Sequence, residues 1–135
     1  MNPLWPDLAG VRLRHAEEAF AAAEVLKAAG HLRDCVNRYY YAVFHATRSL
    51  LALEGFDTSR HGHLIGEFRR VFVKTQVVSR EASDILGRLF KARSEGDYDD
   101  DRSFSSQEVD LLAHDARAFL DEIGRVLRAK GISGS

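Results

Sequence analysis

The chain has 135 residues, of which 45% are hydrophobic, and its 19 basic and 20 acidic side chains leave a net charge of −1. This length suits one domain with one core, and the balanced charge argues against a protein that coats nucleic acid through a uniformly basic surface. No apolar run approaches the roughly 20 residues that span a bilayer, and the N-terminus lacks the basic start and apolar stretch of a secretory signal. We therefore expect a cytoplasmic protein without membrane contact.

Helices are predicted along the whole chain, because both prolines fall within the first six residues and proline is the strongest helix breaker. The first predicted helix covers about residues 7–29. The second covers about residues 32–54 and carries an apolar seam whose members recur at alternating spacings of four and three. The members of this seam are Leu32, Val36, Tyr39, Val43, Ala46, Leu50 and Leu53. Such a seam places the second helix at the centre of a helical bundle.

Three further helices are expected in the second half of the chain. One covers about residues 62–74, and another covers about residues 79–94 with Ser79 as its N-terminal cap. A polar loop, EGDYDDDRSFSS, should follow. Ser105 and Glu108 then form the pattern of a capping box at the start of the last helix. No segment alternates long enough to be a strand, so the expected fold is an all-α antiparallel bundle of four to five helices, one domain over residues 1–135 with its core at about 7–129.

The second predicted helix also carries a polar stripe beside its apolar seam. Seven residues advance a helix by about 700°, nearly two full turns, so Arg38 and His45 share a face. Tyr41 and Arg48 fall on the same stripe, and Asn37 flanks it. Arginine can hold a phosphate by two hydrogen bonds, and histidine can take a proton from a ribose hydroxyl. The stripe therefore indicates either a small nuclease site or a polar surface without chemistry.

Other clusters of functional residue types favour structural roles. His61 and His63 lie two apart and point in different directions on a helix, so we expect them to line a helix start rather than to bind a metal. The acidic run from Asp97 to Asp101 fits a solvated loop better than a cation site. We therefore expect no metal and no cofactor. Tyr39 and Tyr40 should fill core space, which leaves Tyr41 as the tyrosine with a polar role.

Three segments in order resemble the HEPN superfamily, most closely a small branch with a YYA-x-F-H stretch in its second helix. They are NRYYYAVFHATRSLLALEG, HGHLIGEFRRVFVK and RSEGDY, the last holding Arg93, Asp97 and Tyr98. The resemblance implies a HEPN-like bundle that forms a homodimer. It also implies a minimal nucleotidyltransferase as partner, in a toxin–antitoxin or defence-type module. Active relatives resemble metal-independent RNases that use an R-x4–6-H motif at the dimer cleft.

The chain departs from that nuclease pattern at one position. Arg93 is present, but the residues five to seven further on are Tyr98, Asp99 and Asp100 instead of a histidine. We therefore expect a module that binds RNA or nucleotide without a standard catalytic motif. The alternative is a metal-independent endoribonuclease with a displaced site, formed by Arg38 and His45 or by Arg93 with Asp97 and Tyr98. In a third interpretation the partner attaches a nucleotide to Tyr98.

The candidate residues follow from these alternatives. Catalytic roles fall to Arg38, His45 and Arg93. Binding roles fall to Asn37, Tyr41, Arg48, His61, His63, Asp97 and Tyr98.

Overall fold

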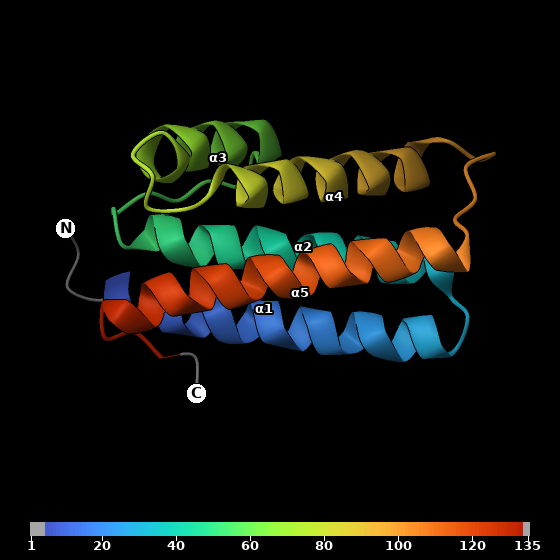
Figure 1. Ribbon diagram of the computed structural model, residues 1–135, viewed down its shortest axis with the longest axis horizontal. Helices are drawn as coiled ribbons and strands as arrows, with labels where there is room; N and C mark the ends of the chain where they lie inside the picture. Colours follow the sequence, from blue (N-terminus) through green and yellow to red (C-terminus); the bar gives the residue numbers. More distant parts are fainter. Residues whose placement is uncertain (1–4, 134–135) are drawn as a thin grey trace.

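A computed structural model describes residues 5–133, and within them it contains five α-helices and no strand. The helices are α1 (Trp5–Ala28), α2 (Leu32–Ala52), α3 (His61–Phe68), α4 (Arg80–Tyr98) and α5 (Ser106–Ala129), and a π-helical turn, η1 (Arg69–Val73), continues α3 (Figure 1). The predicted all-α helical bundle is confirmed. In this part of the chain no helix is both long and apolar enough to cross a membrane.

Helix α2 lies at the centre of the bundle, between α1 on one side and α3 and α4 on the other, with α5 packed along it (Figure 1). The predicted seam explains this position. Its five inner members, from Val36 to Leu50, are at most 1% exposed, while Leu32 and Leu53 at its ends are half-buried. Tyr39 and Tyr40 are fully buried, as predicted. The Tyr39 hydroxyl donates to Glu24 Oε1 at 2.5 Å, so its polar end is satisfied at the edge of the core.

The third predicted helix is interrupted, which the sequence pattern did not indicate. After Phe68 the chain widens into η1, where the Lys74 amide donates to the Arg69 carbonyl at 2.8 Å, five residues back. This turn buries Phe72 beside Phe68, whose ring also packs against Phe119 of α5 at 5.9 Å. The segment then ends in a tight turn in which Gln76 has a left-handed backbone (φ 66°).

The prediction that the fourth helix ends at residue 94 was wrong, because α4 continues to Tyr98. The added turn is held by tertiary contacts. Gly96 is buried against the ring of Phe104, and Arg33 of α2 donates a hydrogen bond to the Gly96 carbonyl. These contacts outweigh the low helix propensity of glycine and aspartate. Tyr98 is therefore the last residue of a helix instead of part of a loop.

The two predicted serine caps are present, although the capping box is only half formed. Ser79 Oγ accepts from the Ala82 amide at 3.1 Å, and Ser105 Oγ accepts from the Glu108 amide at 3.1 Å. The Glu108 carboxylate does not return to the cap residue. It binds the Arg102 guanidinium instead. This interaction is stronger than a hydrogen bond to a backbone amide, because both partners are charged.

Candidate functional site

Tyr41 lies at the meeting point of two arginines from different helices. The Arg38 guanidinium carbon is 5.0 Å from the centre of the Tyr41 ring. Arg93, which α4 contributes 52 residues later, donates from Nη2 to the Tyr41 hydroxyl at 3.2 Å. The Arg93 guanidinium also lies 5.5 and 5.6 Å from the ring centres of Tyr40 and Tyr41. We call Arg38, Tyr41, His45, His61 and Arg93 the Tyr41 cluster.

The two arginines of the cluster differ in how their charge is balanced. Arg93 Nε is 2.8 Å from Asp97 Oδ2 on the next turn of α4, and the two side chains are 15% and 29% exposed. Arg38 has only a long hydrogen bond to Asn37 Oδ1 at 3.4 Å. Within residues 5–133, Arg38 forms no ion pair. Arg38 therefore presents an uncompensated positive charge at the edge of the cluster.

His45 packs beside Tyr41 with its ring partly buried. Its ring centre lies 6.2 Å from that of Tyr41 and 6.0 Å from that of His15 on α1. Burial, helped by the positive charges of Arg48 and other neighbours, lowers the pKa of His45 to about 4. In the described part of the chain its buried Nδ1 has no hydrogen-bond partner. The imidazole is thus neutral at pH 7, a weak base, and no carboxylate orients it.

The two histidines of α3 separate, as their spacing predicted. His61, the first residue of the helix, stacks on Phe44 at 4.5 Å and on Tyr40 at 5.4 Å, and its Nδ1 hydrogen-bonds with the Tyr40 hydroxyl. Burial and then the charge of Arg93 lower the pKa of His61. His63 is exposed and meets only the edge of Phe56, at 5.2 Å. His61 therefore belongs to the Tyr41 cluster and His63 does not.

Two further predicted binding residues lie outside the cluster. Arg48 borders it, with its guanidinium carbon 5.9 Å from the ring centre of Phe44, and Tyr98 lies apart from it. Arg48 forms an ion pair with Asp57 at 2.9 Å, and the other oxygen of Asp57 pairs with the buried Arg12 at 3.0 Å. This arrangement anchors the loop after α2, so Arg48 has a structural role. Tyr98 is 80% exposed at the end of α4, where a partner protein could reach it.

The sequence indicated two alternative sites, Arg38 with His45 or Arg93 with Asp97 and Tyr98. The structure brings Arg38, His45 and Arg93 around Tyr41, with Asp97 paired to Arg93, and leaves Tyr98 apart. The structure also places the rings of Tyr40 and Phe44 against the cluster, and the sequence had not indicated these two residues as part of the site. The polar role expected for Tyr41 was the one sequence signal that could have indicated where Arg38 and Arg93 meet. Chemically, the cluster offers two guanidinium groups, a hydroxyl and aromatic faces, a set suited to phosphate and base contacts.

Comparison with known proteins places this arrangement in a family. A profile of the HEPN domain matches residues 9–126. A UPF0332 protein of Thermotoga maritima is 34% identical over 114 residues, which cover 84% of this chain and 86% of that protein. Two proteins of Methanocaldococcus jannaschii, both named as candidate toxins, are 29% identical over 113 residues and 25% identical over 120 residues. These two matches cover 84% and 89% of this chain, and 84% and 82% of the respective relatives. Because the profile spans nearly the whole helical bundle, the chain belongs to the HEPN domain family.

Proposed function

We propose that this chain is a toxin-type HEPN component of a two-protein module and that it binds RNA through the Tyr41 cluster. The names of the Methanocaldococcus jannaschii relatives support the first part of this proposal. The observation that carries the second part is the convergence of Arg38 and Arg93, from separate helices, on one half-buried tyrosine.

The cluster suits an RNA strand because it combines charge with flat rings. A guanidinium group can hold a phosphate by two hydrogen bonds. Within residues 5–133, Arg38 has no carboxylate partner that a phosphate would have to displace. Single-stranded RNA is commonly recognised by stacking of its unpaired bases on aromatic, histidine or arginine planes. Tyr41 and His61 supply such planes beside the two arginines.

Binding without cleavage fits the histidine of the cluster. A general base works best when its pKa lies near the operating pH, and the pKa of His45 is about 4. Efficient bases are also held in place by a third group, whereas the buried Nδ1 of His45 has no partner within residues 5–133. Arg93 is in addition engaged by Asp97.

A metal-independent endoribonuclease is the second candidate, favoured by the presence of His45 in the same cluster as both arginines. In that reaction His45 would take the proton of a ribose 2′-hydroxyl, whose oxygen then attacks the neighbouring phosphorus. The 5′-oxygen of the next nucleotide would leave, and the product would be a 2′,3′-cyclic phosphate. Arg38 and Arg93 would stabilise the negative charge that develops on the phosphate.

One experiment separates the two candidates. A fluorescent single-stranded RNA is incubated with purified protein in EDTA, with anisotropy reporting binding and gel electrophoresis reporting cleavage. We expect binding without cleavage, and a loss of affinity of about tenfold in Arg38→Gln and in Arg93→Gln, the scale of one charge-assisted hydrogen bond.

The matched control is Arg14→Gln, at an exposed arginine of α1. This helix lies on the opposite side of the bundle from α3 and α4 (Figure 1). The RNA affinity of this control variant should equal that of the wild type. Cleavage by the wild type that disappears in His45→Ala would establish the nuclease instead. Equal RNA affinity in wild type, Arg38→Gln and Arg93→Gln would remove the cluster as the binding site.

We further propose that the protein acts as a homodimer and that its partner is a minimal nucleotidyltransferase. The resemblance in the three sequence segments supports both statements, and the exposure of Tyr98 at the end of α4 leaves that side chain open to such a partner. Light scattering should give twice the 15.1 kDa of one chain, and a larger mass on mixing with the nucleotidyltransferase. A monomer that does not change mass on mixing would contradict both statements.

A further inference from the structure

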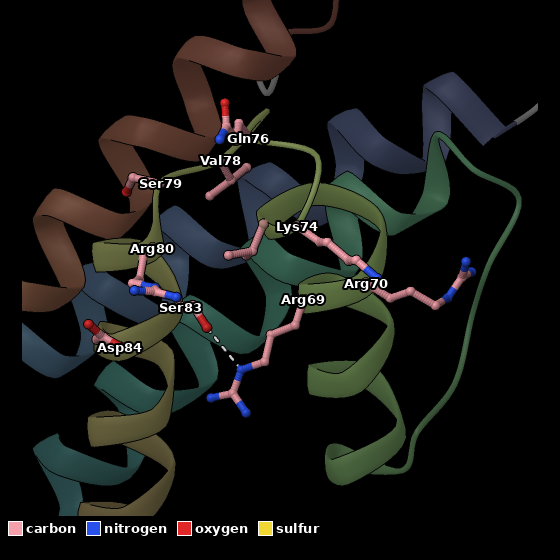
Figure 2. A pocket seen from close by; sticks show the side chains of 10 residues that line it. Arg69, Arg70, Lys74, Gln76, Val78, Ser79, Arg80, Ser83 and Asp84 are labelled. Atoms are coloured by element: carbon pink, nitrogen blue, oxygen red, sulfur yellow. Dashed lines mark hydrogen bonds between the residues drawn. The ribbon is translucent and has the colours of Figure 1, made fainter.

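A second basic site lies on the surface between η1 and the start of α4, separate from the Tyr41 cluster. It is a cavity of about 900 Å³ whose lining includes four basic side chains, Arg69, Arg70, Lys74 and Arg80, and one acidic side chain, Asp84. Figure 2 shows Arg69 reaching across from η1 toward Ser83 of α4, while Arg70 points away from Ser83. A chain with a net charge of −1 therefore concentrates positive charge at this position.

Arg69 is held in place from the α4 side. Its Nε donates to Ser83 Oγ at 2.9 Å. Its Nη2 lies 3.4 Å from where a Cβ atom on Gly87 would stand, so the guanidinium rests over a glycine of α4. A hydrogen bond to a neutral hydroxyl orients the group but leaves its positive charge uncompensated.

The neighbouring acids do not neutralise the cavity. Among the residues that the structure describes, Arg69, Lys74 and Arg80 form no ion pair. The positive charge of Arg70 is compensated, because this residue is paired with Glu67 at 2.8 Å. The nearby carboxylate of Glu122 accepts from the amide and hydroxyl of Ser79, both at 2.7 Å. Asp84, the acidic side chain in the lining, pairs with none of Arg69, Lys74 and Arg80 within residues 5–133, so the cavity keeps an excess of positive charge.

The turn that brings Lys74 toward Arg80 is strained. Gln76 adopts a left-handed backbone conformation (φ 66°), which costs a residue other than glycine about 1–2 kcal/mol. The turn is closed by the Val78 amide, which donates to the Phe72 carbonyl at 2.9 Å. Strain of this kind persists where the surrounding structure enforces it and is typical of binding sites.

We propose that this cavity binds backbone phosphates of the same single-stranded RNA that contacts the Tyr41 cluster, an inference that rests on the proposed function. None of the described residues that line it is aromatic and could stack a base, so the backbone is the part of the strand that it fits. Side chains of α3 and η1 contact α4 at both sites. Arg69 meets Ser83 at the cavity, and the His61 ring lies 6.1 Å from that of Phe90 at the cluster. One RNA strand that follows the boundary between α4 and the segment from α3 to η1 can therefore reach both sites.

The test measures RNA affinity as a function of salt concentration. The pocket variant is Lys74→Gln/Arg80→Gln, two exposed side chains without ion pairs in the described chain. The control is Arg14→Gln/Lys130→Gln, which removes one exposed lysine and one exposed arginine elsewhere. Circular dichroism verifies that both variants are folded. We expect the pocket variant alone to lose affinity, by about tenfold at low salt, and its salt slope to fall by about 1.4, since each phosphate contact to a single strand contributes about 0.7.

The outcomes separate this inference from the proposed function. Unchanged affinity and slope in the pocket variant, with binding lost in Arg38→Gln, would overturn the inference and leave the Tyr41 cluster as the site. A loss of RNA affinity in the pocket variant, with no effect of Arg38→Gln, would support RNA binding at the cavity and would contradict RNA binding at the Tyr41 cluster. An equal loss of affinity in the pocket and control variants would mean that the loss follows from the change in net charge alone, and it would overturn the inference. A wild-type protein that binds no RNA would overturn both proposals.

Discussion

His45 shows how the surroundings of a single residue limit what chemistry it can perform. On sequence alone it was a candidate base, because an unperturbed histidine titrates near neutral pH. In the bundle it is packed between the rings of Tyr41, Phe44 and His15. Burial and the nearby positive charges penalise its protonated form and lower its pKa to about 4. The residue type was predictable, but this environment depends on how α1 and α2 pack.

The depressed pKa of His45 should make the stability of the protein depend on pH. An unfolded histidine has a pKa of about 6.5, so between pH 6.5 and pH 4 the unfolded chain binds a proton that the native His45 does not. The free energy of unfolding therefore falls as the pH is lowered through this window. From pH 7 to pH 5 the full shift corresponds to about 2 kcal/mol, and partial exposure of the ring reduces this to about 1 kcal/mol.

Urea unfolding at pH 7 and pH 5 tests this expectation. The His45→Gln variant should lose about 1 kcal/mol less than the wild type between the two pH values. His63→Gln is the matched control, because His63 is exposed, and it should reproduce the pH dependence of the wild type. Identical pH dependence in all three proteins would show that His45 is not a buried neutral imidazole.

At the scale of elements, α4 connects the two proposed sites. Arg80 lies in its first turn at the cavity, and Arg93 lies near its end at the Tyr41 cluster. The sequence predicted the start of this helix, since the Ser79 cap is a local signal. It did not predict the end. Gly96 and Asp97 favour a loop locally, and the tertiary contacts of Gly96 with Phe104 and Arg33 explain why the helix continues.

Two glycines of α4 should respond in opposite directions to alanine. A Cβ atom on Gly87 would meet only the flexible end of Arg69, at 3.4 Å. Gly87→Ala should therefore gain the helix propensity of alanine and raise the free energy of unfolding by about 0.5–1 kcal/mol. A Cβ atom on Gly96 would lie 3.1 Å from the buried ring of Phe104. Gly96→Ala should lower the free energy of unfolding by about 1 kcal/mol, because the ring must shift.

Chemical denaturation of the two variants beside the wild type measures both effects. Because the substitution and the helix are the same, the difference between them isolates the contact with Phe104. A gain of stability in Gly96→Ala would mean that the last turn of α4 is not packed against Phe104 as described. The positions of Arg93 and Asp97 near that turn would then also be in question.

At the scale of the whole molecule, the fold was predictable and the site was not. The seam of α2 is a repeated local pattern, and burial of its members follows from it. The contact between Arg93 and Tyr41 depends on the rotation of α4 against α2, which no local pattern encodes. Sequence reasoning could therefore name Arg38, Tyr41, His45 and Arg93 but could not place them together.

The parts of the bundle should also differ in local stability. Helix α3 has eight residues, its N-cap residue Arg60 provides no side-chain cap, and η1 ends it with a strained turn at Gln76. Four buried side chains hold this segment, Leu64, Ile65, Phe68 and Phe72, whereas α2 is covered on several sides (Figure 1). We expect α3 and η1 to open without unfolding of the remaining bundle, since local stability follows the extent of buried contacts.

Hydrogen exchange followed by mass spectrometry would detect this opening. Peptides covering residues 61–74 should exchange about tenfold or more faster than peptides covering residues 36–50 of α2. If RNA binds at the cavity, its addition should slow exchange in the first group, because a ligand that binds only the closed form stabilises it. Equal protection of the two groups would mean that α3 and η1 unfold only together with the rest of the bundle. The strained turn would then be as rigid as the core, and the cavity would be preformed before any strand binds.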